Sequence, residues 1–298
     1  MNILSNEQQT AVVAALCDGC SIRAVERMTG IHRDTIMRLG ARIGLGALAF
    51  HDRTMHSLQV PHIQLDETWS YVGKKQRKVK PGDSQDLGDQ YIHLALASTA
   101  KAIIAFRIGK RDSDNTYRFV EDLRERVVNA PEISTDAWPF YGPAIRDAFG
   151  DRCSHGVVQK VFAGEPARDA ARRYSPGYVV EVNRYAVIGE PEHICTSHIE
   201  RQNLTLRMQQ RRFTRLTNGF SKKLENHVAS VGLYVAHYNF CRVHEALGRR
   251  HTPAMALGLT DHVWTIGELM QACLADRERE PRQLPPRGGF RVIEGGKQ

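Results

Sequence analysis

The chain has 298 residues, with 41 Lys plus Arg against 33 Asp plus Glu and a formal net charge of +8. An apolar content of 42% and a charged content of 25% are ordinary for a folded protein, and no stretch approaches the roughly 20 apolar residues of a membrane helix. Six cysteines are too few for a disulfide scaffold, and the first residues lack a signal-peptide pattern, so a reducing cytosol is expected. The charge permits a nucleic-acid partner.

Residues 1–46 predict three short helices, over 6–18, 22–28 and 33–43, with a turn at Gly30 before the third. Two helices joined by a glycine turn, the second with a polar outer face, are typical of a helix-turn-helix, whose last helix enters the major groove of DNA. The side chains expected to contact DNA are Arg33, Thr35 and Arg38. An ordinary three-helix cap that binds no DNA is the alternative.

Residues 47–60 are predicted to be a linker, and beyond them the pattern changes to strands. Strands are expected over 62–69, 91–97, 102–108, 131–136 and 155–162, and helices over 115–128 and 144–149. Three strands, a helix, a strand, a helix and a strand predict an α/β core of ribonuclease H-like order, which we place at residues 61–265 behind the all-α helix-turn-helix domain. Residues 163–192 carry little hydrophobic pattern and are expected to form an irregular insertion.

Two further helices are expected over 197–208 and 224–241. Residues 266–298 are expected to complete a C-terminal helix and to end in a disordered tail. Five cations lie in the seven residues from Lys74 to Lys80, which we interpret either as a solvated hairpin tip or as a second contact with DNA.

Three carboxylates lie at positions in predicted strands and helices that indicate a function. Asp66 lies inside an apolar strand and Asp136 at the end of another, where an ionised carboxylate is costly unless it is paired or binds a metal. Asp136 is also suited to cap the turn that follows it. Glu200 lies on a predicted helix, and Arg207 falls two turns further on, about 20° from Glu200 around the axis. This spacing suits an enzyme that holds a phosphodiester at a metal centre.

Segments 66–73, 135–138 and 198–207 resemble the three catalytic blocks of a DDE transposase, most closely of the insertion sequence 1 family. Segments 211–223 and 238–244 add to the resemblance, which spans roughly residues 5–265. It implies that Asp66, Asp136 and Glu200 are the catalytic triad and the ligands of Mg²⁺, with two ions expected and Mn²⁺ able to substitute. By the same resemblance, Arg207 takes the place of the basic residue that often follows the glutamate by seven.

The resemblance implies metal-dependent strand cleavage at the ends of a mobile element, followed by attack of the freed 3′-OH on target DNA. The implied partners are double-stranded DNA, at terminal inverted repeats and target sites, and further copies of the chain, with no membrane. The implied location is the bacterial or archaeal cytoplasm, at the nucleoid. A non-catalytic DNA-binding regulator derived from a transposase and a ribonuclease H-like nuclease are the alternatives.

Four further residues carry separate expectations. Consecutive strand residues face opposite sides, so Glu67 is expected to point away from a metal held by Asp66. Cys17 and Cys20 form a Cys-x-x-Cys pair without a second pair to complete a zinc site, and both are expected to be small core residues. Trp138 suits either core packing or stacking on a base.

The positive charge is concentrated after the predicted catalytic glutamate. Residues 201–223 contain seven cations and no acidic residue, whereas a solvated surface helix usually mixes both signs. Phosphate-binding cations are expected to cluster, because each neutralised phosphate releases counterions. The predicted basic track for DNA consists of Arg201, Arg207, Arg211, Arg212, Arg215, Lys222 and Lys223.

Overall fold

The computed structural model describes residues 4–163, 177–214 and 218–275. Its α-helices are α1 (Asn6–Cys17), α2 (Ile22–Thr29), α3 (Arg33–Thr54), α4 (Ser113–Arg126), α5 (Tyr141–Phe149), α6 (Ser197–Gln209), α7 (Leu224–Phe240), α8 (Pro253–Ala256) and α9 (Ile266–Ala275). Its strands are β1 (His62–Val72), β2 (Gly88–Ala97), β3 (Ala102–Gly109), β4 (Glu132–Asp136), β5 (Ser154–Ala163) and β6 (Tyr178–Ile188). The chain is therefore a mixed α/β protein, as its pattern predicts.

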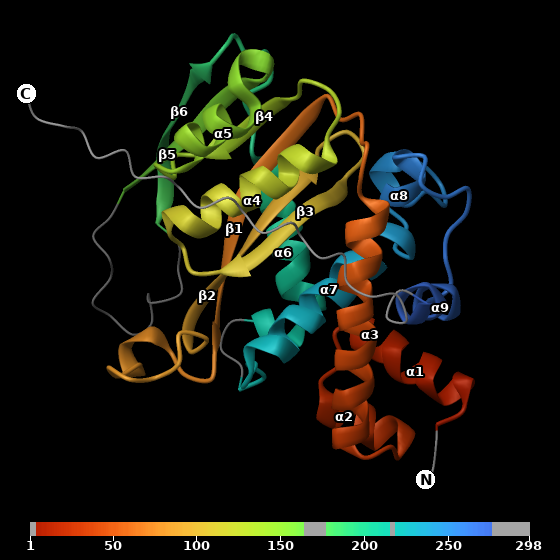
Figure 1. The fold of residues 1–298 in the computed structure, drawn as a ribbon. Coiled ribbons are helices and arrows are strands. Elements are labelled where there is room, and N and C mark those ends of the chain that lie inside the picture. The colour runs from red at the N-terminus through yellow and green to blue at the C-terminus, as the bar shows by residue number, and fades with distance from the viewer. Residues whose placement is uncertain (1–3, 164–176, 215–217, 276–298) are drawn as a thin grey trace, which may run out of the picture.

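The described strands form one sheet in the order β3-β2-β1-β4-β5-β6 (Figure 1). β1, β2 and β3 pair antiparallel as a meander. β4 then pairs parallel to both β1 and β5, because α4 and α5 return the chain to the same end of the sheet before each strand. The carboxyl ends of β1, β4 and β5 consequently point in one direction.

Helices cover both faces of this sheet (Figure 1). On one face α4 and α5 bury a hydrophobic cluster that includes Leu65 of β1 and Phe119 of α4. On the other face α6 and α7 bury a second cluster that includes Leu94 of β2 and Ile199 of α6. Alternate residues of β1 therefore face different layers, and Asp66, next to Leu65, faces α6.

Helix α3 differs from its prediction: the helix expected to end at Ile43 continues to Thr54, through most of the predicted linker. Gly44 and Gly46 lower helix propensity and suggest an early end. In the structure, however, a Cβ at Gly44 would overlap the carbonyl oxygen of Ala229 on α7, and one at Gly46 that of Cys273 on α9. The glycines therefore allow close packing of three helices, which outweighs their low propensity.

Strand β6 is a second correction, because it falls within residues 163–192, which are predicted to be irregular. It pairs antiparallel with β5 at the edge of the sheet, and almost all of its residues are exposed or half-buried. Without a buried face, no hydrophobic alternation is required of the strand. Residues 164–176 of the predicted insertion, and 276–298 of the predicted tail, lie outside the described residues.

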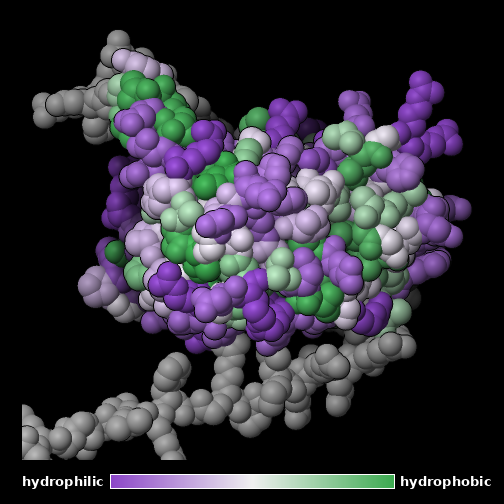
Figure 2. All heavy atoms as spheres, turned by 90° about the horizontal axis from the view of Figure 1, so that it is seen from above, coloured by the Kyte–Doolittle hydropathy of each residue, from purple (hydrophilic) through white to green (hydrophobic). Residues whose placement is uncertain are grey.

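Hydrophilic residues dominate the face seen from above, with hydrophobic residues scattered among them and one group at a corner (Figure 2). Among the described residues, the hairpin of β5 and β6 exposes a set of large apolar side chains: Val161, Phe162, Tyr178, Val179, Val180, Val182 and Tyr185. None of the described helices has both the length and the apolar character needed to cross a bilayer.

Candidate functional site

The pairing of β1 with β4 places Asp66 beside Asp136. Leu65 lies opposite Thr135 in the parallel register, so the next residue on each strand points to the face covered by α6. Neighbouring strands are about 4.8 Å apart, which brings the two carboxylates together at the point where β4 ends. Asp136 also accepts a hydrogen bond from the Trp138 backbone N–H, 3.0 Å away, so it caps the turn as well.

Glu67 joins this pair, contrary to the expectation that it points away. One carboxylate oxygen each of Asp66, Glu67 and Asp136 lie within 4.8 Å of one another. Strand alternation does hold for the Cβ atom, because Glu67 packs beside His93 on the opposite face, with Oε1 3.7 Å from Nδ1. The pairing of β1 with β4 ends one residue before Asp66, however, and the longer Glu67 side chain reaches around the open end of β4.

The three carboxylates repel one another in a poorly solvated site. Burial, followed by the charges of Asp136 and Glu67, raises the pKa of Asp66 to about 7. Burial and the charge of Glu67 raise the pKa of Asp136 to about 6. The ionised forms of Asp66 and Asp136 are therefore disfavoured until a cation is near. The guanidinium of Arg111 supplies part of that charge, at 3.5 Å from both Glu67 Oε2 and Asp136 Oδ2.

Helix α6 is fastened to β1 at two points. The buried side chain of Gln64 accepts hydrogen bonds from the backbone N–H groups of His198 and Ile199, both at 3.0 Å, and so caps the first turn in place of a side chain from the helix itself. One turn on, Asn203 Nδ2 donates to Asp66 Oδ2 at 2.8 Å. Glu200 lies between these two points and thus beside the carboxylates of the strands.

The Glu200 carboxylate is not one of the three carboxylates that lie within 4.8 Å of one another. Its negative charge nevertheless contributes to raising the pKa of Asp136. Its Oε1 pairs with Lys160 Nζ of β5 at 2.5 Å and accepts from Thr196 Oγ1 at 2.6 Å. Glu67, Arg111 and Lys160 are the functional candidates that the sequence did not indicate. Arg111 and Lys160 carry no sequence signal, because only the fold brings them to the carboxylates in the middle of β1 and at the end of β4.

Carboxylates in this arrangement fit a hard divalent cation. Asp66 and Asp136 offer oxygen ligands, which Mg²⁺ prefers, and their mutual repulsion is relieved by positive charge. Arg111 and Lys160 supply cations at the rim of the group but do not lower the pKa of Asp66 to its ordinary range. Trp138 is accounted for by packing, since its Nε1 donates to Thr116 Oγ1 at 3.1 Å and Arg111 lies 4.0 Å above its ring.

A groove of about 970 Å³ lies between the N-terminal helices and the segment after α6. The residues that line it include Arg33, at the start of α3, and three cations of the segment after α6: Arg211, Arg212 and Lys222. Two stretches of positive charge that are far apart in the sequence thus face one space. Arg38 is exposed and Thr35 half-buried on α3, and neither lines the groove.

The cations after Glu200 differ in their surroundings. Arg201, Arg211, Lys222 and Lys223 are exposed and Arg207 is half-buried, whereas Arg215 lies outside the described residues. Arg212 donates to Ser221 Oγ at 2.9 Å, and the same hydroxyl lies 2.9 Å from His227 Nδ1. Burial lowers the pKa of the Arg212 guanidinium, and this half-buried side chain holds the segment in place through Ser221 while it lines the groove.

Residues 176–241 match the family model described as IS1 transposase. The match confirms the predicted resemblance to the insertion sequence 1 family and supports a transposase role. It contains Glu200 and Arg207, whereas Asp66 and Asp136 lie outside it.

Among solved structures, the chain is similar to one in the cryo-EM structure of the piggyBac transposase synaptic complex with hairpin DNA. The two are 12% identical with a TM-score of 0.39, and the match covers 96% of this chain and 76% of that one. No curated protein matches the chain significantly.

Proposed function

We propose that the chain is a DDE transposase that cleaves DNA strands at the ends of a mobile element and joins the freed 3′-OH to target DNA. The observation that carries the proposal is the placement of Asp66 and Asp136 side by side on β1 and β4, with Glu200 fastened next to them by α6. The strand order, an antiparallel meander followed by two parallel strands, is that of a ribonuclease H-like core, which supports residues 61–265 as the catalytic unit.

Asp66, Asp136 and Glu200 are the proposed ligands for Mg²⁺, or for Mn²⁺ in its place, and Glu67 is added as a fourth oxygen donor. Two ions bound to these residues would supply positive charge to the attacking and leaving oxygens of the reaction. The chain's own residues then have separate tasks. Asn203 and Gln64 hold α6 against β1, Arg111 limits repulsion between Glu67 and Asp136, and Lys160 neutralises Glu200.

We propose that residues 1–46 bind DNA as a helix-turn-helix. Gly30 has a φ of 70° at the end of α2, the left-handed conformation that a tight turn between two helices needs. The start of α3 exposes Arg33 and Arg38. Together with Arg33, the exposed Arg211 and Lys222 make the groove a positively charged path from α3 toward α6. Pairing of two element ends further suggests that the enzyme works as a homo-oligomer.

A DNA cleavage and joining assay separates this proposal from its alternatives. The substrate is a labelled duplex carrying the inverted repeats that flank the gene, with a supercoiled plasmid as target and Mg²⁺ in the buffer. A transposase nicks the repeat end and inserts the freed 3′ end into the plasmid. A ribonuclease H-like nuclease gives cleavage without joined product, and a DNA-binding regulator shifts the duplex in a gel without cleaving it.

Removing positively charged side chains from the groove should weaken DNA binding and reduce the dependence of binding on salt concentration. In the double variant Arg211→Gln, Lys222→Gln, loss of two phosphate contacts makes the negative slope of log K against log [salt] shallower by about 1.8, since each contact contributes about −0.9. Fluorescence anisotropy over a salt series measures this slope. Arg118→Gln, which removes an exposed cation of α4, is the matched control and should leave it unchanged. An unaltered slope in the double variant would remove the groove from the interface.

A further inference from the structure

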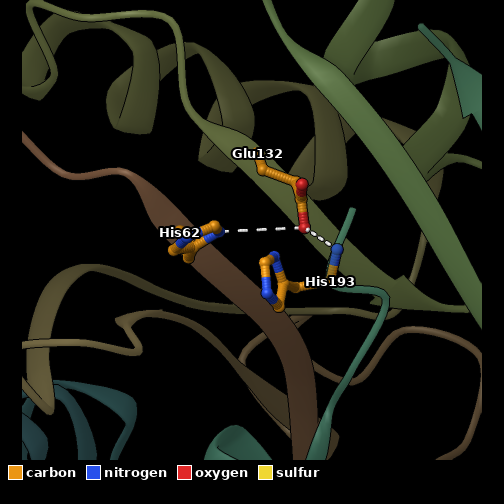
Figure 3. Close-up of side chains that lie close together, drawn as sticks. All are labelled: His62, Glu132 and His193. Atoms are coloured by element: carbon orange, nitrogen blue, oxygen red, sulfur yellow. Dashed lines mark hydrogen bonds and ion pairs between the residues drawn. The ribbon is translucent and has the colours of Figure 1, made fainter. Parts of the chain in front are cut away.

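A second cluster of ligand-type side chains lies at the start of β1 and β4, whereas the carboxylates lie in the middle of β1 and at the end of β4. His62 and Glu132, the first residues of the two strands, are opposite each other in the parallel register. His193 joins them from the segment that connects β6 to α6, and the three side chains point toward one another (Figure 3). One ligand atom from each lies within 4.8 Å of the other two.

The Glu132 carboxylate organises this cluster. Its Oε2 accepts a hydrogen bond from the Glu192 backbone N–H, and its Oε1 accepts one from that of His193, both at 2.7 Å. These bonds fix the backbone of the connecting segment, so the His193 ring lies 5.1 Å from the His62 ring, centroid to centroid. The carboxylate keeps lone pairs on both oxygens, and its side chain is only 12% exposed.

One ring nitrogen of His62 is buried without a hydrogen-bond partner in the protein. This nitrogen, Nδ1, lies 3.7 Å from Glu132 Oε1. A buried nitrogen without a partner costs free energy. A cation between Nδ1 and the carboxylate would satisfy both.

We propose that His62, Glu132 and His193 bind a divalent transition-metal ion, with Zn²⁺ as the best match. Two imidazoles and one carboxylate, with a fourth position left for water, form a set that Zn²⁺ takes in proteins. Mg²⁺ prefers a ligand set made only of oxygen atoms. This site is therefore expected to bind a different ion from the one held by the carboxylates of Asp66 and Asp136. Ligands of tetrahedral Zn²⁺, at about 2.0–2.1 Å from the metal, lie roughly 3.4 Å apart, and rotation of the exposed His193 ring closes the remaining distance.

The ion would fasten the segment that leads into α6. Ser134 Oγ of β4 already donates to the His193 carbonyl oxygen and accepts from the Cys195 backbone N–H, both at 3.2 Å. Zn²⁺ bound to His193 adds a stronger link between the same segment and the starts of β1 and β4. This link does not depend on the chemistry proposed for Glu200.

Zinc binding to the full-length protein tests the proposal. The protein is dialysed against a chelator and titrated with ZnCl₂ by calorimetry in the presence of excess MgCl₂, and bound metal is counted by plasma mass spectrometry. We expect one Zn²⁺ per chain and a rise in melting temperature on its addition. His193→Ala and His62→Ala should each weaken binding by more than about 100-fold, and neither variant should be stabilised by zinc.

Two control variants locate the ion. Cys20→Ser removes the Cys-x-x-Cys pair and Asp136→Asn changes the carboxylate group, and both should bind Zn²⁺ as the unsubstituted chain does. His193 is exposed, so its replacement by Ala should leave the melting temperature without zinc unchanged. Absence of zinc binding, binding that survives His193→Ala, or binding lost in either control would overturn the proposal.

Discussion

Asp136→Asn is expected to lower DNA strand cleavage and joining by about 10³-fold while changing the affinity for element ends less than about twofold. The substitution keeps the shape of the side chain, and the amide oxygen can still accept the hydrogen bond from Trp138 N–H. It removes the negative charge that binds the cation. A metal centre contributes several kcal/mol to stabilising the transition state of phosphoryl transfer, and each 1.36 kcal/mol is about tenfold in rate.

The measurement is the cleavage and joining assay described above, run with a binding titration of the same duplex. Asp151→Asn, an exposed carboxylate outside the site, is the matched control and should cleave at the normal rate. Undiminished cleavage by Asp136→Asn would refute the assignment of this residue. Loss of binding together with cleavage, at an unchanged melting temperature, would show that Asp136 serves DNA binding instead.

The local pattern of the sequence is enough to place the two strand carboxylates in their elements. Polar residues inside or at the end of apolar strands are unusual, and the strand order predicted from the periodicity puts β1 next to β4. Glu200 depends on the resemblance, because its helix carries no pattern that distinguishes one surface carboxylate from another. What no local rule supplies is the register of β1 against β4, which makes Asp66 and Asp136 neighbours.

Failures of the sequence prediction have a common origin in tertiary contacts. The strand rule assigns Glu67 to the wrong side because it describes where Cβ points and takes no account of how far a long side chain reaches past the end of a neighbouring strand. The helix rule ends α3 too early because Gly44 is unfavourable in an isolated helix yet required where α7 approaches. Strand β6 escapes prediction because all its residues except Ile188 are exposed or half-buried, and backbone pairing with β5 requires no apolar alternation.

The last expected result concerns the stability of the protein without metal. Asp66→Asn should raise the melting temperature at pH 8 by about 4 °C. The pKa of Asp66 is raised from 3.8 to about 7, first by burial and then by Asp136 and Glu67. The folded state therefore binds this proton more tightly than the unfolded state, and its stability falls as the pH rises from about 4 to about 7. Above pH 7 Asp66 is ionised in the folded state, and its ionisation lowers the free energy of unfolding by on the order of 2 kcal/mol after relaxation and solvent screening.

For a chain of this size, 1 kcal/mol shifts the melting temperature by about 2 °C, which gives the expected rise. The amide introduced by Asp66→Asn keeps a hydrogen-bond partner on α6. Asn203 Oδ1 is buried and has no hydrogen-bond partner at present, so after a flip of the Asn203 amide it can accept a hydrogen bond from the new NH₂ group. Below pH 5 most of this ionisation penalty is absent, so the variant should gain less than about half as much.

Differential scanning calorimetry at pH 5 and pH 8, with and without Mg²⁺, measures these effects. Mg²⁺ at pH 8 should stabilise the unsubstituted chain, since binding to the folded state alone raises its stability, and should stabilise Asp66→Asn much less. A variant that melts lower than the unsubstituted chain at both pH values would mean that the Asp66 charge holds the fold together. The carboxylates would then form a structural network with Arg111, which pairs with Glu67 and Asp136, and with Asn203, which donates to Asp66, and not a group that requires a metal.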